Sequence, residues 1–135
     1  MTQTVQQTIT AFLEAGPFAV VGASVDRSKY GNKVLRCYQQ HGRVVFPINA
    51  RADEVEGLKA FPSLAALPVP VKAISVITPP AITEQVVRDA ASAGVTHIWM
   101  QPGAESAEAI RSAEAAGMAV IAGGPCLLVV LGYHE

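Results

Sequence analysis

Short apolar runs that recur along the chain constrain the fold more than any other feature. Four of them lie at residues 18–22, 44–48, 73–77 and 97–100, and a fifth lies at residues 119–122. Each run is continuous rather than alternating with polar residues, which is typical of strands covered on both faces. These runs predict the strands of a parallel sheet packed between two layers of helices.

Segments with a helical spacing of apolar residues separate the predicted strands. The first is expected to end at a C-cap glycine, Gly16. In the third, we expect Thr78 to cap the N-terminus and Pro80 to occupy the first turn. The residues expected to face the core are Val34, Leu35 and Tyr38 in the second helix, Ile82, Val86, Ala90 and Ala93 in the third, and Ile110 and Ala113 in the fourth.

This alternation predicts an α/β fold with a doubly wound, mostly parallel sheet that has helices on both faces. Between the second and third predicted strands, residues 57–61 are expected to form a short strand and residues 62–67 a helical turn. With 135 residues and no linker or internal repeat, the chain is expected to be a single domain, residues 1–135.

Composition excludes several classes of partner. Only 16% of the residues are charged and the net charge is -1, so the chain has no basic surface for nucleic acid or an anionic membrane. No apolar run approaches the roughly 18 residues of a spanning helix, and residues 1–14 lack the features of a secretory leader. The two cysteines, Cys37 and Cys126, form neither a CxxC pair nor a metal-ligand cluster. We therefore expect a cytoplasmic protein with no metal site.

Open α/β sheets bind ligands beyond the carboxyl ends of their strands, at the point where the strand order reverses. After the first predicted strand, Gly22, Ala23 and Ser24 form a small turn that allows a phosphate to approach the backbone at the start of the next helix. Ser24 adds a hydroxyl group and Lys29 a positive charge. The same residues also suit a tight strand-to-helix turn that binds no ligand, so both interpretations stay open.

The fingerprint of nicotinamide dinucleotide sites is incomplete. The second and third glycine positions of G-x-G-x-x-G are Ser24 and Arg27, and no acidic residue follows the second strand before Asp53. Arg51, at the end of that strand, is suited to an additional ribose phosphate, unless it is merely solvated. The residues thus favour NADP or coenzyme A over NAD.

The next strand ends contribute further candidates. Thr78 and Pro79 offer a hydrogen-bonding group and a flat apolar ledge for an adenine or a pantetheine arm, although helix initiation also explains them. Gln101, Pro102 and Gly103 place an amide and a turn at the same rim, and Trp99 before them is expected in the core.

No catalytic constellation is evident. His41, His97 and His134 have no serine, cysteine or acid nearby in the predicted fold, and His97 is expected at a strand edge. Cys126 follows the fifth strand and therefore lies on the ligand rim, but no basic residue adjoins it to activate the thiol.

The order and spacing of several short motifs resemble a known family. The motifs are AVVGAS at residues 19–24, VFPIN at 45–49, Gly57, WMQPG at 99–103 and EAAG at 114–117. Together they resemble the small stand-alone CoA-binding proteins of bacteria and archaea, and the CoA-binding domain of the succinyl-CoA synthetase α subunit. The resemblance covers about residues 10–126 and implies a Rossmann-like fold.

The resemblance also implies roles for individual residues. It implies that the turn after the first strand holds the diphosphate of CoA, and that the adenosine ribose and its phosphate lie near the end of the second strand. The pantetheine arm is expected at the turn after the fourth strand. The residues carried over in this order are Gly22, Ala23, Ser24 and Lys29; Asn49 and Arg51; Thr78 and Pro79 along the nucleotide; and Gln101, Pro102 and Gly103.

Two departures from the family bear on catalysis. Succinyl-CoA synthetases carry a second domain with a phosphorylated histidine, for which 135 residues leave no room, so their mechanism is not expected here. Stand-alone members often have an arginine before the cysteine of the last turn, whereas Pro125 precedes Cys126 in this chain.

We therefore expect a domain that binds coenzyme A or an acyl-CoA, a small-molecule nucleotide, and acts as a carrier, a sensor or the partner of an enzyme. Two alternatives stay open: an NADP- or CoA-dependent enzyme that uses Cys126, and an interaction subunit whose pocket is vestigial. Residues 127–133 are strongly apolar, which predicts a contact with a second copy or with a partner enzyme.

Overall fold

The computed structural model describes residues 4–135, and its centre is a five-stranded parallel sheet. Neighbouring strands follow the order β2-β1-β5-β6-β7, and all four pairs are parallel. The strands are β1 (Phe18–Val21), β2 (Val45–Ile48), β5 (Ala73–Val76), β6 (His97–Met100) and β7 (Ala119–Ile121). The predicted α/β fold is confirmed. Residues 1–3 of the N-terminal segment examined for a leader lie outside the described residues.

The continuous apolar runs arise because both faces of the sheet are covered. In β1, Phe18 and Val20 belong to one apolar cluster, and Ala19 and Val21 belong to a second cluster on the opposite face. All four side chains are buried. A strand in this position has no polar face, and therefore no alternating pattern.

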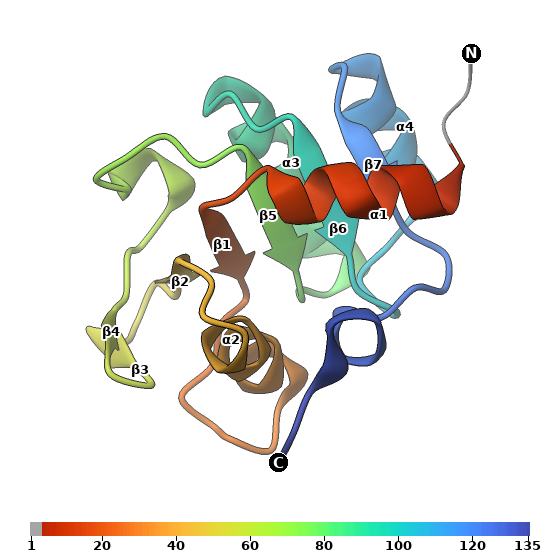
Figure 1. The fold of residues 1–135 in the computed structure, drawn as a ribbon. Coiled ribbons are helices and arrows are strands. Elements are labelled where there is room, and N and C mark those ends of the chain that lie inside the picture. Colours follow the sequence, from red (N-terminus) through yellow and green to blue (C-terminus); the bar gives the residue numbers. More distant parts are fainter. Residues whose placement is uncertain (1–3) are drawn as a thin grey trace.

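Helices cover the sheet in two layers (Figure 1). The helices α1 (Val5–Glu14) and α2 (Tyr30–Gln40) pack on one face, and α3 (Pro80–Ser92) and α4 (Ala107–Ala115) pack on the other. Between β2 and β5 the chain forms a small antiparallel hairpin of β3 (Glu54–Val55) and β4 (Leu58–Lys59), followed by the 3-10 turn η1 (Leu64–Ala66). The expected short strand and helical turn are present here, whereas β3 was not predicted.

The start of α3 and the end of α1 differ from the prediction. The N-cap of α3 is Pro79 rather than Thr78, because the residue before Pro80 is held extended, with φ -58° and ψ 149°. The Thr78 hydroxyl instead lies 2.7 Å from the Thr83 hydroxyl. The C-cap of α1 is Ala15, one residue before Gly16, and its N–H donates to the Phe12 carbonyl.

Most inward-facing positions are confirmed, but α3 contains two exceptions. Val86 and Ala90 are buried, whereas Ile82 and Ala93 are exposed. Both exposed residues line hollows on the surface rather than the core. A helical spacing of apolar residues is the same for a wall of a groove as for a core face, which explains the difference.

The C-terminal segment folds back onto its own chain. The turn η2 (Leu128–Gly132) lies beside α2 (Figure 1). Leu127 is completely buried, and Leu128 and Leu131 pack against the same cluster as α1 and α2. These leucines serve the internal core, which leaves Val129 and Val130 as the exposed part of the expected contact surface. Within residues 4–135, no helix has the length and apolarity needed to cross a membrane.

Replacing a tail leucine tests this role. We expect Leu127→Ala to lower the free energy of unfolding by about 2 to 4 kcal/mol, because it creates a cavity at a fully buried position. The matched control Val129→Ala, at an 81% exposed position, is expected to change it by less than about 0.5 kcal/mol. Urea denaturation measures both, and equal effects would contradict the tail as part of the core.

Candidate functional site

The strand order reverses between β1 and β5. From β1 the chain continues to β2 on one side, then returns to place β5 on the other side. At the carboxyl ends of these two strands, Gly22 has a φ of 95°, and a Cβ added there would lie 2.3 Å from the Ile77 carbonyl oxygen. Only glycine allows the two chain segments to approach so closely.

A groove of about 690 Å³ lies at this reversal point. Loops that follow β1, β2 and β5 form one wall, and residues 62–64 and α3 form the other. Six of the predicted site residues line it together: Gly22, Ala23, Asn49, Arg51, Thr78 and Pro79. Sequence reasoning missed three lining residues: Ile82, which it assigned to the core; Val86, a core residue as expected that also lines the groove; and Asp89.

Asn49 joins two of these loops. Its Nδ2 donates to the Ala23 carbonyl at 2.8 Å, and its Oδ1 accepts from the N–H groups of Arg51 and Ala52 at 2.8 and 2.9 Å. Its polar atoms are therefore already engaged, and it holds the loops after β1 and β2 together at the groove. Arg51 is exposed, and no acidic side chain in residues 4–135 forms an ion pair with it.

The loop of residues 22–29 is built from local hydrogen bonds. The Ser24 hydroxyl accepts from the Asp26 N–H at 3.1 Å. The Asp26 carboxylate accepts from the hydroxyl and the N–H of Ser28, and these bonds lower the pKa of Asp26. Lys29 occupies the N-cap of α2 without a side-chain hydrogen bond to the helix, so this N-terminus has no side-chain cap. Neither Ser24 nor Lys29 lines the groove itself.

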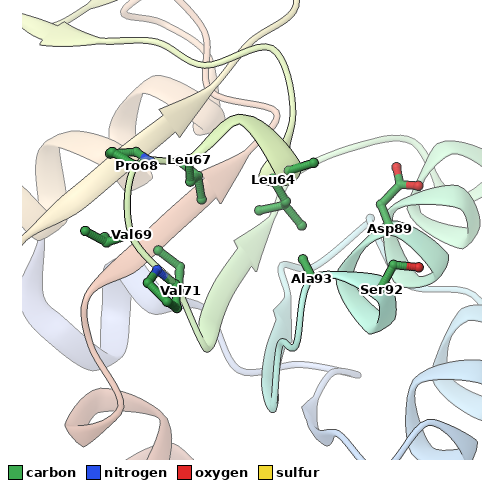
Figure 2. A pocket seen from close by; sticks show the side chains of 10 residues that line it. Leu64, Leu67, Pro68, Val69, Val71, Asp89, Ser92 and Ala93 are labelled. Carbon is green, nitrogen blue, oxygen red and sulfur yellow. The ribbon is translucent and has the colours of Figure 1, made fainter.

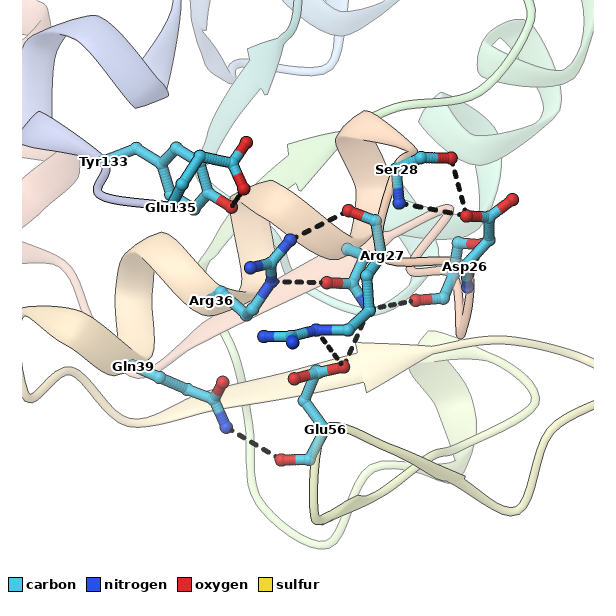
Figure 3. Close-up of polar contacts among 10 residues, drawn as sticks. Asp26, Arg27, Ser28, Arg36, Gln39, Glu56, Tyr133 and Glu135 are labelled. Carbon is cyan, nitrogen blue, oxygen red and sulfur yellow. Dashed lines mark hydrogen bonds and ion pairs between the residues drawn. The ribbon is translucent and has the colours of Figure 1, made fainter.

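A partly buried polar cluster braces this loop against α2 and the hairpin (Figure 3). Asn32 donates to the Ser24 carbonyl at 2.8 Å and to the Glu56 carboxylate at 3.1 Å. Glu56 also pairs with Arg27 at 3.4 Å. Arg36 donates to Asn32 Oδ1 and to the Arg27 carbonyl, at 2.6 and 2.8 Å. Spacing along the sequence did not indicate this cluster, because its members come from three separate elements.

The first turn of α2 lies directly against the loop. A Cβ added to Gly31 would lie 2.0 Å from the Gly22 carbonyl oxygen, so no larger residue fits without displacing the backbone. Glycine at this position was not recognised from the sequence. It brings the uncapped end of α2 to the carboxyl end of β1.

A second, smaller hollow of about 190 Å³ shares Ile77 with the groove. Its other lining residues are Tyr30, Gln101, Pro102 and Cys126. Of the predicted residues at this strand end, Gln101 and Pro102 are thus brought together with Cys126. Gly103 does not line the hollow and adopts a turn with a φ of 93°.

A third hollow, of about 400 Å³, continues the groove along α3 (Figure 2). Leu67, Val69 and Val71 face Ser92 and Ala93 across it. None of the predicted site residues lines it, and its walls carry no cationic side chain that would hold a phosphate.

Burial affects Trp99 and the titratable side chains of Cys37 and His97. Trp99 is buried as expected. Burial, and to a lesser degree the charge of Cys126, raises the pKa of Cys37 to about 11. His97 is half-buried at the start of β6, where burial lowers its pKa. Within residues 4–135, no cluster of side chains is suited to a metal ion.

Comparison with known proteins identifies relatives of this chain. A family model described as "CoA binding domain" matches residues 17–132. The α subunit of acetate–CoA ligase (ADP-forming) II of Pyrococcus furiosus is 32% identical over 85 residues. That match covers 62% of this chain and only 19% of the relative, so the chain spans about a fifth of the length of this curated relative.

Two solved structures are also similar. A conserved hypothetical protein from Pyrococcus furiosus is 42% identical, with a TM-score of 0.78, and the match covers 84% of this chain and 97% of that one. The dinucleotide-forming acetyl-coenzyme A synthetase 1 of Ca. Korarchaeum cryptofilum, in complex with phosphate and ADP, is 35% identical with a TM-score of 0.71. That match covers 78% of this chain and 25% of that one.

The different environments of the two thiols lead to a direct prediction. At pH 8 we expect iodoacetamide to modify Cys126 and to leave Cys37 intact in the folded protein, because the thiolate is the nucleophile and the buried Cys37 stays protonated. Peptide mass spectrometry locates the modification. In urea both thiols should react, and modification of Cys37 in the native protein would contradict its burial.

Glu56 is expected to hold the loop of residues 22–29. Replacing it by alanine in Glu56→Ala removes the contacts to Arg27 and Asn32, and we expect faster amide exchange in residues 24–29 and a stability loss of about 1 kcal/mol. Glu54→Ala, on the exposed side of the same hairpin, is the control. Hydrogen exchange measured by mass spectrometry tests this, and unchanged exchange in the loop would show that the brace is dispensable.

Proposed function

Because this chain belongs to the CoA binding domain family, we propose that it binds coenzyme A or an acyl-CoA in the groove beyond β1, β2 and β5, without catalysing a reaction on its own. The observation that carries the proposal is the position of this groove at the reversal of strand order. Loops from three separate strands meet there, and six residues expected from the sequence line it.

The charges around the groove suggest how the phosphates lie. The uncapped N-terminus of α2 and the exposed Lys29 favour a diphosphate beside the loop of residues 22–29. Arg51 lies on the rim of the groove and is free to pair with the ribose phosphate that distinguishes CoA from ADP. Asp89 also lines the groove, and its carboxylate disfavours anionic groups beside it.

The apolar part of the groove suits a flat ring. Pro79 and Ile82 are exposed at its wall, next to the loop that carries Arg51. An adenine packed on these side chains would cover apolar surface that otherwise faces water. This accounts for an isoleucine that is 53% exposed on α3.

A binding role without catalysis rests on the chemistry of the lining. Neither histidine nor cysteine lines the groove, and Asn49 and Thr78 are engaged within the chain. The groove therefore presents no activated nucleophile with an oriented base. The relatives that are acetyl-CoA-forming enzymes are much longer chains, of which this one corresponds to a part.

Calorimetric titration with CoA tests the proposal. We expect Arg51→Ala and Lys29→Ala each to weaken binding about tenfold, with effects that diminish as salt is added. Dephospho-CoA, which lacks the ribose phosphate, separates the two roles. With this ligand, Arg51→Ala is expected to have no further effect, whereas Lys29→Ala keeps its effect.

The control is Arg88→Ala, which removes an exposed cation of α3 that bonds Gln85 and does not line the groove. It is expected to leave the Kd unchanged. No binding of CoA, acetyl-CoA or ADP at millimolar concentration would overturn the proposed function. An equal loss in Arg88→Ala would show that only net charge matters.

A further inference from the structure

The small hollow beside the groove contains an unused hydrogen-bond donor. Gln101 is only 4% exposed, and its side chain lines the hollow with Tyr30, Ile77, Pro102 and Cys126. Gln101 Oε1 accepts from the N–H of Leu127 at 3.3 Å. Gln101 Nε2 is buried and has no partner among residues 4–135.

The Leu127 contact fixes the orientation of the amide. If the amide were rotated by half a turn, its NH₂ group would face the N–H of Leu127, and two donors would oppose each other. The NH₂ group is therefore the part without a partner. Buried donors are almost always paired in folded proteins, so this one points to an acceptor supplied from outside the chain.

Another buried polar atom without a partner lies in the same loop but has a different role. Glu105 Oε2 is also unpaired within residues 4–135, while Glu105 Oε1 accepts from the N–H of Gly103 at 3.3 Å. Glu105 does not line the hollow. It accepts from the turn after β6, whereas Gln101 Nε2 is a buried donor on a residue that lines the hollow.

The other walls define what carries the acceptor. Ile77 and Pro102 are apolar, the exposed Tyr30 contributes an aromatic ring with its hydroxyl group, and the half-exposed Cys126 adds a thiol, which is a weak hydrogen-bonding group. A buried amide donor in such surroundings suits a carbonyl oxygen flanked by apolar or sulfur groups. A volume of about 190 Å³ limits the group to a small one.

Building on the proposed function, we propose that this hollow binds the thioester of a short-chain acyl-CoA, with Gln101 Nε2 donating to the thioester carbonyl. Ile77 belongs to both the groove and the hollow, so a ligand anchored by its nucleotide reaches the hollow without crossing another element. Free CoA ends in a thiol, which accepts hydrogen bonds poorly. The amide carbonyls of the pantetheine arm are common to both ligands, so the acceptor that an acyl-CoA adds is its thioester carbonyl.

A pair of ligands that differ only in the carbonyl tests the hydrogen bond. Acetyl-CoA has it, and the thioether S-ethyl-CoA lacks it while keeping the size. We expect wild-type protein to bind acetyl-CoA about tenfold more tightly in calorimetry. In Gln101→Met, which keeps the length of the side chain without the donor, the two ligands are expected to bind equally.

A second readout uses the wild-type chain alone, in case Gln101→Met fails to fold. Because Cys37 is buried, the alkylation rate of Cys126 reports access to the hollow. Saturating acetyl-CoA is expected to slow alkylation by iodoacetamide at least about fivefold. ADP, which occupies the nucleotide part of the groove only, is expected to leave the rate unchanged.

The outcomes separate this inference from the proposed function. Equal affinities of the wild-type protein for acetyl-CoA and S-ethyl-CoA would overturn the role of Gln101, as would an unchanged preference in Gln101→Met. Equal alkylation rates with acetyl-CoA and with ADP would place the acyl group outside the hollow. In each case binding of CoA itself still supports the groove, whereas absence of all CoA binding overturns both.

Discussion

Two backbone contacts at the end of β1 determine where the other parts of the site lie. Gly22 packs against the carbonyl of Ile77, and Gly31 packs against the carbonyl of Gly22. The first contact joins β1 to β5, and the second brings the start of α2 against the same loop. Side chains at either position would separate these segments. The groove and the small hollow both adjoin this junction, and Ile77 lines both of them.

The sheet was predictable because burial on both faces leaves a simple signal. Each strand is a short continuous apolar run, and β1 shows why, since Phe18 and Ala19 enter opposite cores. Helix boundaries were less certain, because a single proline moves the cap from Thr78 to Pro79. Periodicity placed Ile82 in the core, although it lines the groove, because the apolar residues of a groove wall and of a core face have the same helical spacing.

The site was predictable only where it follows directly from strand ends. Gly22, Asn49, Arg51 and Pro79 each come just after a strand, so the topology brings them together. The polar cluster around Glu56 was not visible, because its members are joined by the folding of the hairpin onto α2. The burial of Leu127 within the chain was not predicted for a related reason. Apolar residues that serve an internal core look the same in the sequence as those that serve a subunit contact.

Glu56 combines a backbone conformation that is unfavourable for glutamate with side-chain contacts that hold the loop of residues 22–29. It is the one non-glycine residue of the described chain with a positive φ, 50°, directly before Gly57 in the hairpin turn. Glycine would relax the backbone there but would remove the carboxylate that holds Arg27 and Asn32. These side-chain contacts offset the strained backbone, and through them the hairpin after β2 contributes to the order of the loop after β1.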